Sequence, residues 1–391
     1  MGNRYEIASV SWPDHLVFGE GDGKLDTPAS LERRMDWWRN AAGARVVHWR
    51  EVRTRSRLSH YYATPDNPRT QERKIASIRW DDFEIVPRLA HKLGMKAQLY
   101  VSVMDDGRPL PSDEERARSY HNALHGQHVT WQTDWSRDHP EYAVESRDGS
   151  ARQWGVLCYG YPEVRRQMIS RVLGLLNGHD FDGVFVCLRS QCRPAEFADQ
   201  FGFNDPVREQ LLAASGKDIR REDFDVAAWR SVLGSHLTGF LRELRAALSA
   251  KRLTLSVGIP RGDIIGPPIG NWDLQWRTWV REKLVDEIVV DQDSSRCPSM
   301  WHALWPMHRG YGYLQNYIDG KNLLPLKEDL QSTYAPVLAG SGTRLFVARQ
   351  WHAPDEREEA ALRAIPVVSG LVFSTFRCDN PGAIARGDFR A

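Results

Sequence analysis

Three acidic residues at the ends of predicted strands could carry acid–base chemistry. Asp291 and Asp293 follow the apolar stretch 288–290, and their alternate spacing places both carboxyls on one side if the strand continues. Like charges this close raise the pKa of one carboxyl, so one can donate a proton while the other stays ionised. Glu51 ends another strand-like segment, 46–51. We expect Asp291 to be one catalytic carboxyl, with Asp293 or Glu51 as its partner. The alternative is that these groups are solvated or pair with arginines.

Arginines at predicted strand ends form a second candidate set. The members expected to bind substrate are Arg50, Arg189, Arg261 and Arg349. A guanidinium binds carboxylate or sulfate through two parallel hydrogen bonds. A substrate bearing uronic acid or sulfate groups would explain these arginines. The alternative is that they pair with nearby acidic residues and only connect the strand ends.

Aromatic residues form the third set, because the chain has 15 tryptophans and many lie in predicted loops. An indole ring offers apolar area and a polar edge, which suits stacking against sugar rings. A histidine at a strand end could contact a sugar hydroxyl or carry a proton. The substrate-binding residues expected from this set are Tyr100, Trp131, Trp154, Trp301, Trp351 and His352.

These residues need a fold that brings strand ends together. Strand-like and helix-like segments alternate along the chain, which predicts a (β/α)8 barrel with long loops, as a single domain over residues 1–391. In such barrels the active site lies at the carboxyl ends of the strands. The expected strands are 5–11, 44–50, 95–103, 184–189, 252–259, 287–291, 311–317 as the seventh, 344–350 and 371–376.

Helix signals separate most of these strands. Thr27 and Pro28 form a cap and a first-turn proline, and Gly94 ends a second helix. Segments 54–79 and 105–159 are expected to be long loops, and loops of this length are usually functional. The expected helices are 27–42, 81–93, 162–176, 206–214, 226–250, 272–284, 327–338 and 356–368.

Composition argues against several classes of protein. The formal net charge is +1 and no basic block occurs, so a nucleic-acid partner is not expected. No apolar run is long enough to span a membrane. The chain starts without an apolar signal segment, which favours a cytoplasmic location, or a periplasmic or secreted one if a signal was removed. The oligomeric state is left open.

No metal or cofactor is expected either. The 5 cysteines include no CxxC pair, which argues against a disulfide framework or a thiolate zinc site. His121, His125 and His128 have helical spacing, but they lie outside any known zinc motif. No glycine-rich phosphate-binding motif followed by a lysine is present.

Four short motifs carry a family resemblance over about a fifth of the chain. They are His139-Pro140-Glu141-Tyr142, Arg147-Asp148-Gly149, Tyr161-Pro162-Glu163-Val164-Arg165 and Phe181-Asp182-Gly183-Val184. Their order resembles the glycosyl-hydrolase-10-like barrel proteins. The resemblance implies a barrel that hydrolyses glycosidic bonds in carbohydrate, a reaction that ordinarily uses two carboxyl groups.

The chain departs from that pattern where catalytic carboxylates would be expected. Relatives commonly have a second Asp along the fourth strand, where this chain has Cys187. The larger clan of retaining barrel glycosidases places Glu after strands four and seven, whereas this chain has Arg189 and Arg349-Gln350. The acid–base pair of that clan is therefore not transferred.

The sequence thus favours a glycoside hydrolase acting on an anionic poly- or oligosaccharide. Two alternatives stay open. A lyase could remove a proton beside a uronate carboxyl that arginine neutralises. A barrel that binds glycan without cleaving it would explain the missing carboxylates.

Overall fold

The chain is described by a computed structural model. It describes residues 4–10, 25, 27–51, 59–61, 80–107, 109, 131–188, 190, 195, 199–266, 269–290, 324–349 and 356–374, and gives only the backbone for 59–61, 131, 271 and 374.

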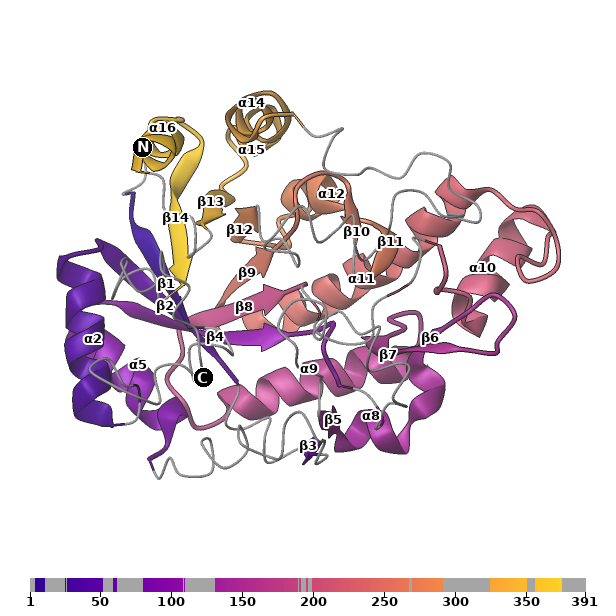
Figure 1. Ribbon diagram of the computed structural model, residues 1–391, viewed down its shortest axis with the longest axis horizontal. Coiled ribbons are helices and arrows are strands. Elements are labelled where there is room, and N and C mark those ends of the chain that lie inside the picture. Colours follow the sequence, from indigo (N-terminus) through magenta and orange to yellow (C-terminus); the bar gives the residue numbers. More distant parts are fainter. Residues whose placement is uncertain are drawn as a thin grey trace, which may run out of the picture.

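Eight parallel strands close into a barrel (Figure 1). They are β1 (Glu6–Val10), β2 (Ala44–Arg50), β4 (Lys96–Ser102), β8 (Gly183–Cys187), β9 (Thr254–Gly258), β12 (Glu287–Val290), β13 (Arg344–Arg349) and β14 (Val368–Ser374). Their order around the barrel is β1-β14-β13-β12-β9-β8-β4-β2, and each neighbouring pair is parallel. The prediction of a (β/α)8 barrel is confirmed.

One predicted strand has no place in the barrel wall. β12 pairs directly with β13, with Ile288 opposite Leu345, and β13 pairs with β14. The prediction of 311–317 as the seventh strand is therefore wrong, since β13 occupies that position. Residues 311–317 were predicted as a strand because aromatic residues favour strands in general. It lies outside the described residues.

Helices surround the barrel: α2 (Pro28–Asn40), α5 (Asp82–Lys92), α9 (Pro162–Leu176), α11 (Val226–Ser249), α12 (Trp276–Arg281), α14 (Leu326–Asp329), η2 (Leu330–Tyr334), α15 (Ala335–Leu338) and α16 (Glu356–Arg363). The Thr27 hydroxyl accepts a hydrogen bond from the Ser30 amide at 3.1 Å, which begins α2 as predicted. Gly94, at φ +69°, follows α5. The predicted helix 272–284 is shorter than expected, because 270–273 form a strand instead.

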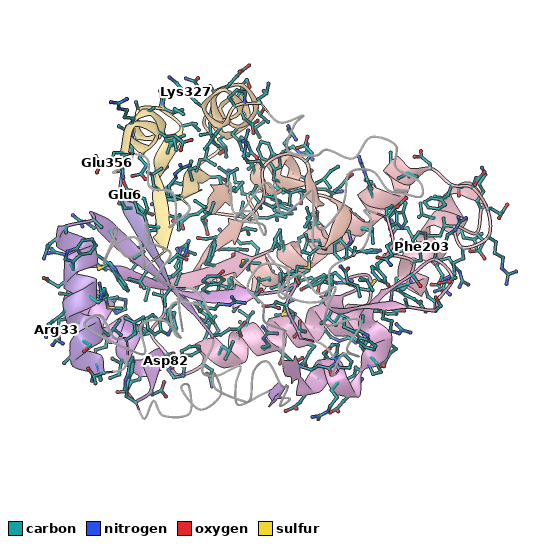
Figure 2. All side chains as sticks on the ribbon, in the orientation of Figure 1. Glu6, Arg33, Asp82, Phe203, Lys327 and Glu356 are labelled. Atoms are coloured by element: carbon teal, nitrogen blue, oxygen red, sulfur yellow. The ribbon has the colours of Figure 1, made fainter. Side chains whose placement is uncertain are left out.

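The connections after β4 and β8 build a lobe on the side to which the arrows of these strands point (Figure 1). The lobe consists of α8 (Asp134–Asp138), η1 (Pro140–Tyr142), the antiparallel pair β6 (Ala143–Glu145) and β7 (Arg152–Leu157), and α10 (Asp205–Ser215). Asn204 joins its two parts by donating to the Ala143 carbonyl at 2.9 Å. In Figure 2, Phe203 marks this lobe and Arg33 marks α2 on the opposite side of the view. The expected long loop 105–159 is thus largely structured from residue 131 onward.

Two small antiparallel pairs of strands complete the described elements. β3 (Ser59–Tyr61) pairs with β5 (Trp131–Thr133), which gives structure to part of the expected loop 54–79. β10 (Ile264–Gly266) pairs with β11 (Gly270–Asp273) after β9. These pairs follow strand ends, so they add to the side of the barrel where a site would form.

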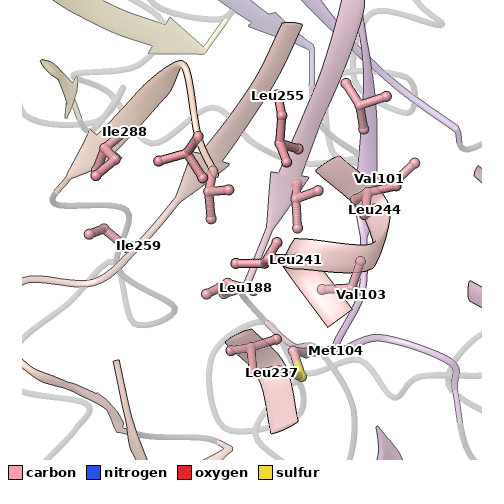
Figure 3. Close-up of a cluster of buried hydrophobic side chains, with 14 of the residues drawn as sticks. Val101, Val103, Met104, Leu188, Leu237, Leu241, Leu244, Leu255, Ile259 and Ile288 are labelled. Atoms are coloured by element: carbon pink, nitrogen blue, oxygen red, sulfur yellow. The ribbon is translucent and has the colours of Figure 1, made fainter. Parts of the chain in front are cut away.

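Apolar side chains fill both sides of the barrel wall. Leu237, Leu241 and Leu244 of α11 pack toward outward residues of the strands such as Val101 and Leu255 (Figure 3). Inside, a second cluster comprises Ile7, Val46, Tyr100, Phe185, Cys187, Val289, Phe346 and Val372. Each fully buried aliphatic side chain contributes about 2 kcal/mol to folding. Together the two layers hold the strand ends in fixed positions.

The described helices include none with both the length and the hydrophobicity needed to cross a lipid bilayer.

Candidate active site

The inward faces of β2 and β4 lead from an apolar interior to a charged mouth. Val46 and Tyr100 belong to the inner cluster. Because side chains alternate along a strand, His48 and Arg50 share the inward face with Val46. The His48 ring stacks on Phe185 with a centroid distance of 4.0 Å, which confirms its inward orientation. Arg50 is therefore the last inward residue of β2.

Arg50 is held by an ion pair at this mouth. Its Nη2 lies 2.8 Å from Oδ2 of Asp105, which follows β4. The two side chains are 8% and 1% exposed. The Arg50 guanidinium carbon lies 5.4 Å from the centre of the Tyr100 ring, and the Tyr100 hydroxyl donates to Cys187 Sγ at 3.3 Å. A charged pair and an aromatic ring thus meet at the carboxyl ends of β2, β4 and β8.

Glu51 occupies the outward side of the same strand end. Its Oε1 lies 2.6 Å from Nη2 of Arg171, a residue of α9, and its side chain is 2% exposed. Arg171 also reaches Asp106, with 3.1 Å between Nη1 and Oδ1. Burial alone would lower the pKa of Arg171, but Glu51 and Asp106 outweigh that effect and raise it. Arg171 therefore stays charged, and the ion pair holds the Glu51 carboxylate against α9.

Arg171 is not among the site residues predicted from the sequence. Its signal was present nonetheless, because Arg171 lies among the buried positions Val164, Met168, Val172 and Leu175 of α9. A charged residue in the apolar stripe of a helix must find a partner in the interior. The helical period alone could have marked it as a buried ion-pair donor.

The other two described strand-end arginines also pair with carboxylates. Arg261, after β9, has its Nε 3.2 Å from Oδ2 of Asp329 in α14. Arg349, at the end of β13, pairs with Glu358 of α16. These contacts match the alternative that the arginines connect neighbouring elements. Arg189 lies outside the described residues.

The remaining predicted residues divide into two groups. Trp154 lies on β7 and is half-buried, whereas Trp131 is described only by its backbone, which pairs with Tyr61. The predicted residues outside the described ranges are Asp291, Asp293, Arg189, Trp301, Trp351 and His352. The structure thus brings Arg50, Glu51 and Tyr100 together at one strand end, while Arg261 and Arg349 are held by α14 and α16.

Burial controls the titration of two groups near this region. It lowers the pKa of His48 to about 3, with a small opposing effect from Gln98, so His48 is neutral at ordinary pH. Burial also raises the pKa of Cys158 to about 12, so its thiol is not a ready nucleophile. Within the part of the chain that the structure describes, no three His, Cys, Asp or Glu residues are grouped to hold a metal ion. His121, His125 and His128 lie outside that part.

Solved structures share this architecture. The glycoside hydrolase domain of PgaB (BpsB) from Bordetella bronchiseptica matches with a TM-score of 0.53 at 13% identity, over 98% of this chain and 97% of that one. The β-galactosidase from Marinomonas ef1 matches with a TM-score of 0.51 at 12% identity, over 94% of this chain and 53% of that one. The chain shares its barrel fold with these two structures.

A third similar structure is a longer protein. The α-L-fucosidase isoenzyme 2 from Paenibacillus thiaminolyticus has a TM-score of 0.48 at 13% identity. The match covers 98% of this chain but 49% of that enzyme, so this chain spans about half its length. No protein-family model and no curated protein sequence matches the chain. The resemblance to the glycosyl-hydrolase-10-like group therefore stays a prediction.

Proposed function

We propose that this protein is a glycoside hydrolase with its active site at the carboxyl ends of the barrel strands. The observation that carries the proposal is the buried Arg50–Asp105 pair, which lies at the mouth of a barrel whose fold is shared with glycoside hydrolases. Charged groups at this end of a (β/α)8 barrel are typical of catalysis or binding, whereas those at the opposite end are typical of stability.

Asp291 is the proposed catalytic acid. Val289 belongs to the inner cluster, and Asp291 follows it at the two-residue spacing of positions on one side of a strand. Asp293 is the proposed partner, in keeping with the same alternation. Glu51 is the weaker partner, because Arg171 already holds its carboxylate against α9. The separation of the two carboxyls would decide between retention, at about 5–5.5 Å, and inversion, at about 6.5–9.5 Å.

The proposed substrate is a poly- or oligosaccharide. The Arg50–Asp105 pair offers donors and acceptors side by side, a combination that suits sugar hydroxyls. An anionic sugar is the finer proposal, and it depends on Arg189. The arginines at 50, 261 and 349 support it less, because each is paired with a carboxylate.

A barrel that binds glycan without cleaving it is the second candidate. It is favoured by Cys187, which accepts a hydrogen bond from Tyr100 at a position where the resembling family has an aspartate. A thiol in this place cannot serve as the carboxylate of a hydrolase.

A panel of neutral, uronate-containing and sulfated oligosaccharides tests these proposals. New reducing ends without ultraviolet absorbance indicate hydrolysis, and a new C=C absorbance indicates a lyase. Ligand-induced thermal stabilisation without any product indicates the binding barrel. The proposal of a hydrolase is refuted if binding is measured and no product forms across the panel.

A further inference from the structure

Two dipeptides at neighbouring strand ends are arranged in the same way. Arg50 ends β2 and Glu51 follows it, and Asp105 and Asp106 follow β4. The first member of each dipeptide joins the inward ion pair of 2.8 Å. The second member of each binds Arg171 on the outside, at 2.6 Å for Glu51 and 3.1 Å for Asp106. Arg171 of α9 thus binds both dipeptides on the outer side of the barrel wall.

We propose that Arg171 is a positioning residue that fixes the Arg50–Asp105 pair for contact with the sugar, an inference that rests on the proposed function. Arg171 does not lie on the inward face, so it acts through its neighbours. The side chain of Arg171 is 12% exposed, and those of its two carboxylate partners are nearly fully buried. Its Nη2 also donates to the Ser102 carbonyl at 3.3 Å, so side chains and backbone are held together.

Backbone contacts connect the ion pairs of Arg171 to the Arg50–Asp105 pair. The Glu51 amide donates to the Tyr100 carbonyl at 3.2 Å, which continues the pairing of β2 with β4 beyond the strand. The Asp106 amide donates to the Gly155 carbonyl at 3.0 Å, which fixes the loop after β4 against β7 of the lobe. Glu51 and Asp106 are each one peptide bond from the inward pair, so movement of either moves that pair. A shift of about 1 Å at a substrate-positioning group can reduce the rate about a hundredfold.

The alternative is that Arg171 contributes to stability alone. A matched control separates these roles, because Arg245 of α11 makes a similar contact at the other end of the barrel. Its Nη1 lies 2.5 Å from Oδ2 of Asp286, which precedes β12, and the same carboxylate accepts from the Leu255 amide at 2.8 Å. Both arginines therefore tie a helix to a strand end, but only Arg171 does so at the proposed site.

The test compares Arg171→Gln with Arg245→Gln in the full chain, at a temperature well below the melting temperature of each variant. We expect both to melt earlier than the wild type. Only Arg171→Gln should lose kcat/KM, by about tenfold or more, through a misplaced substrate. Equal kcat/KM in the two variants would overturn the proposal.

A structural measurement keeps the proposal independent of the reaction. Crystal structures of the wild type and Arg171→Gln should show the Arg50–Asp105 pair intact only in the wild type. An unchanged pair in the variant refutes the positioning role, even if the panel finds no hydrolysis. If Arg171→Gln does not fold, Arg171→Lys replaces it, because a single ammonium keeps the charge but does not fork onto two carboxylates. Wild-type-like kcat/KM and an intact pair in Arg171→Lys would also refute the proposal.

Discussion

Arg50 and Asp105 are 55 residues apart in the chain and form a buried ion pair of 2.8 Å. The pair exists because β2 and β4 are neighbours in the barrel, with Arg50 opposite Tyr100 in the strand register. An arginine in this position looks like an anion-binding group in the sequence. In the structure its charge is already balanced by a carboxylate, which shifts the proposed role from binding an anion to hydrogen bonding with a sugar.

Asp105→Asn is expected to destabilise the protein by about 3 kcal/mol, since it removes the negative charge from the buried ion pair with Arg50. It should also reduce kcat/KM. Urea unfolding and steady-state kinetics measure both effects. The control is Asp205→Asn, which removes an exposed pair of 3.0 Å with Arg208 and should cost less than about 1 kcal/mol. Equal losses for the two variants would contradict a buried, site-forming pair.

Glu287→Gln probes the opposite end of the barrel. Glu287 is fully buried and accepts hydrogen bonds from Tyr5 at 3.1 Å and Gln98 at 3.0 Å, as well as from Ser256 and Arg344. The NH2 group of glutamine is itself a donor and would face the side chains that now donate to the carboxylate. We therefore expect a loss of about 3 kcal/mol in unfolding free energy. Turnover per folded molecule should stay unchanged, because this network lies at the amino ends of the strands. A selective loss of kcat would show that the network acts on the site.

Much of the barrel could be predicted from local sequence. The bounds of α9, Pro162–Leu176, match the predicted helix, because a first-turn proline and an apolar stripe define it. The strand 44–50 was also predicted with its bounds, since it is a run of strand-forming residues after Gly43. The prediction of 311–317 as the seventh barrel strand was wrong, because composition can favour a strand but does not identify the strand that it pairs with. That residues 1–391 form one domain stays a prediction.

The site was harder to predict, because it depends on partners far apart in the chain. Arg50 and Glu51 are adjacent, yet one pairs inward with Asp105 and the other outward with Arg171. Strand alternation predicts opposite sides for the two, but it does not identify the partners. The partner of Arg261, Asp329, lies in α14, which no local pattern connects to β9. The roles of Asp291 and Asp293 stay predictions.

The unfolding free energy should fall at acid pH because of His48 and His236. Burial lowers the pKa of His48 to about 3, and burial together with Arg165 lowers that of His236 to about 4, from an ordinary value of 6.5. The unfolded chain therefore binds protons below about pH 6.5 that the folded chain does not, so stability falls as the pH drops from about 6.5 toward 4. His48→Gln should reduce the slope of unfolding free energy against pH by up to about 1.4 kcal/mol per pH unit in this window.

The matched control for that slope is His139→Gln, because the His139 side chain is 45% exposed. His139→Gln should change the slope less than His48→Gln does. The measurement is urea unfolding at several values between about pH 4 and 7. Equal slopes for His48→Gln and the wild type, whatever their stabilities at neutral pH, would contradict the lowered pKa of His48.

Asp291→Asn tests the proposed acid. An amide of the same shape cannot donate a proton to a leaving group, so kcat should fall by about a thousandfold, within the range that general acid catalysis contributes. Substrate binding, followed by thermal stabilisation with an oligosaccharide, should persist, because the hydrogen-bonding shape is kept. The control is Asp223→Asn on the exposed segment before α11, which should leave both quantities unchanged. Asp293→Asn should also lower kcat, and the residual activity should lose the acidic limb of the pH–rate profile, since that limb reports ionisation of the partner carboxyl. Unchanged turnover in Asp291→Asn would remove this residue from the mechanism and return Glu51 to consideration.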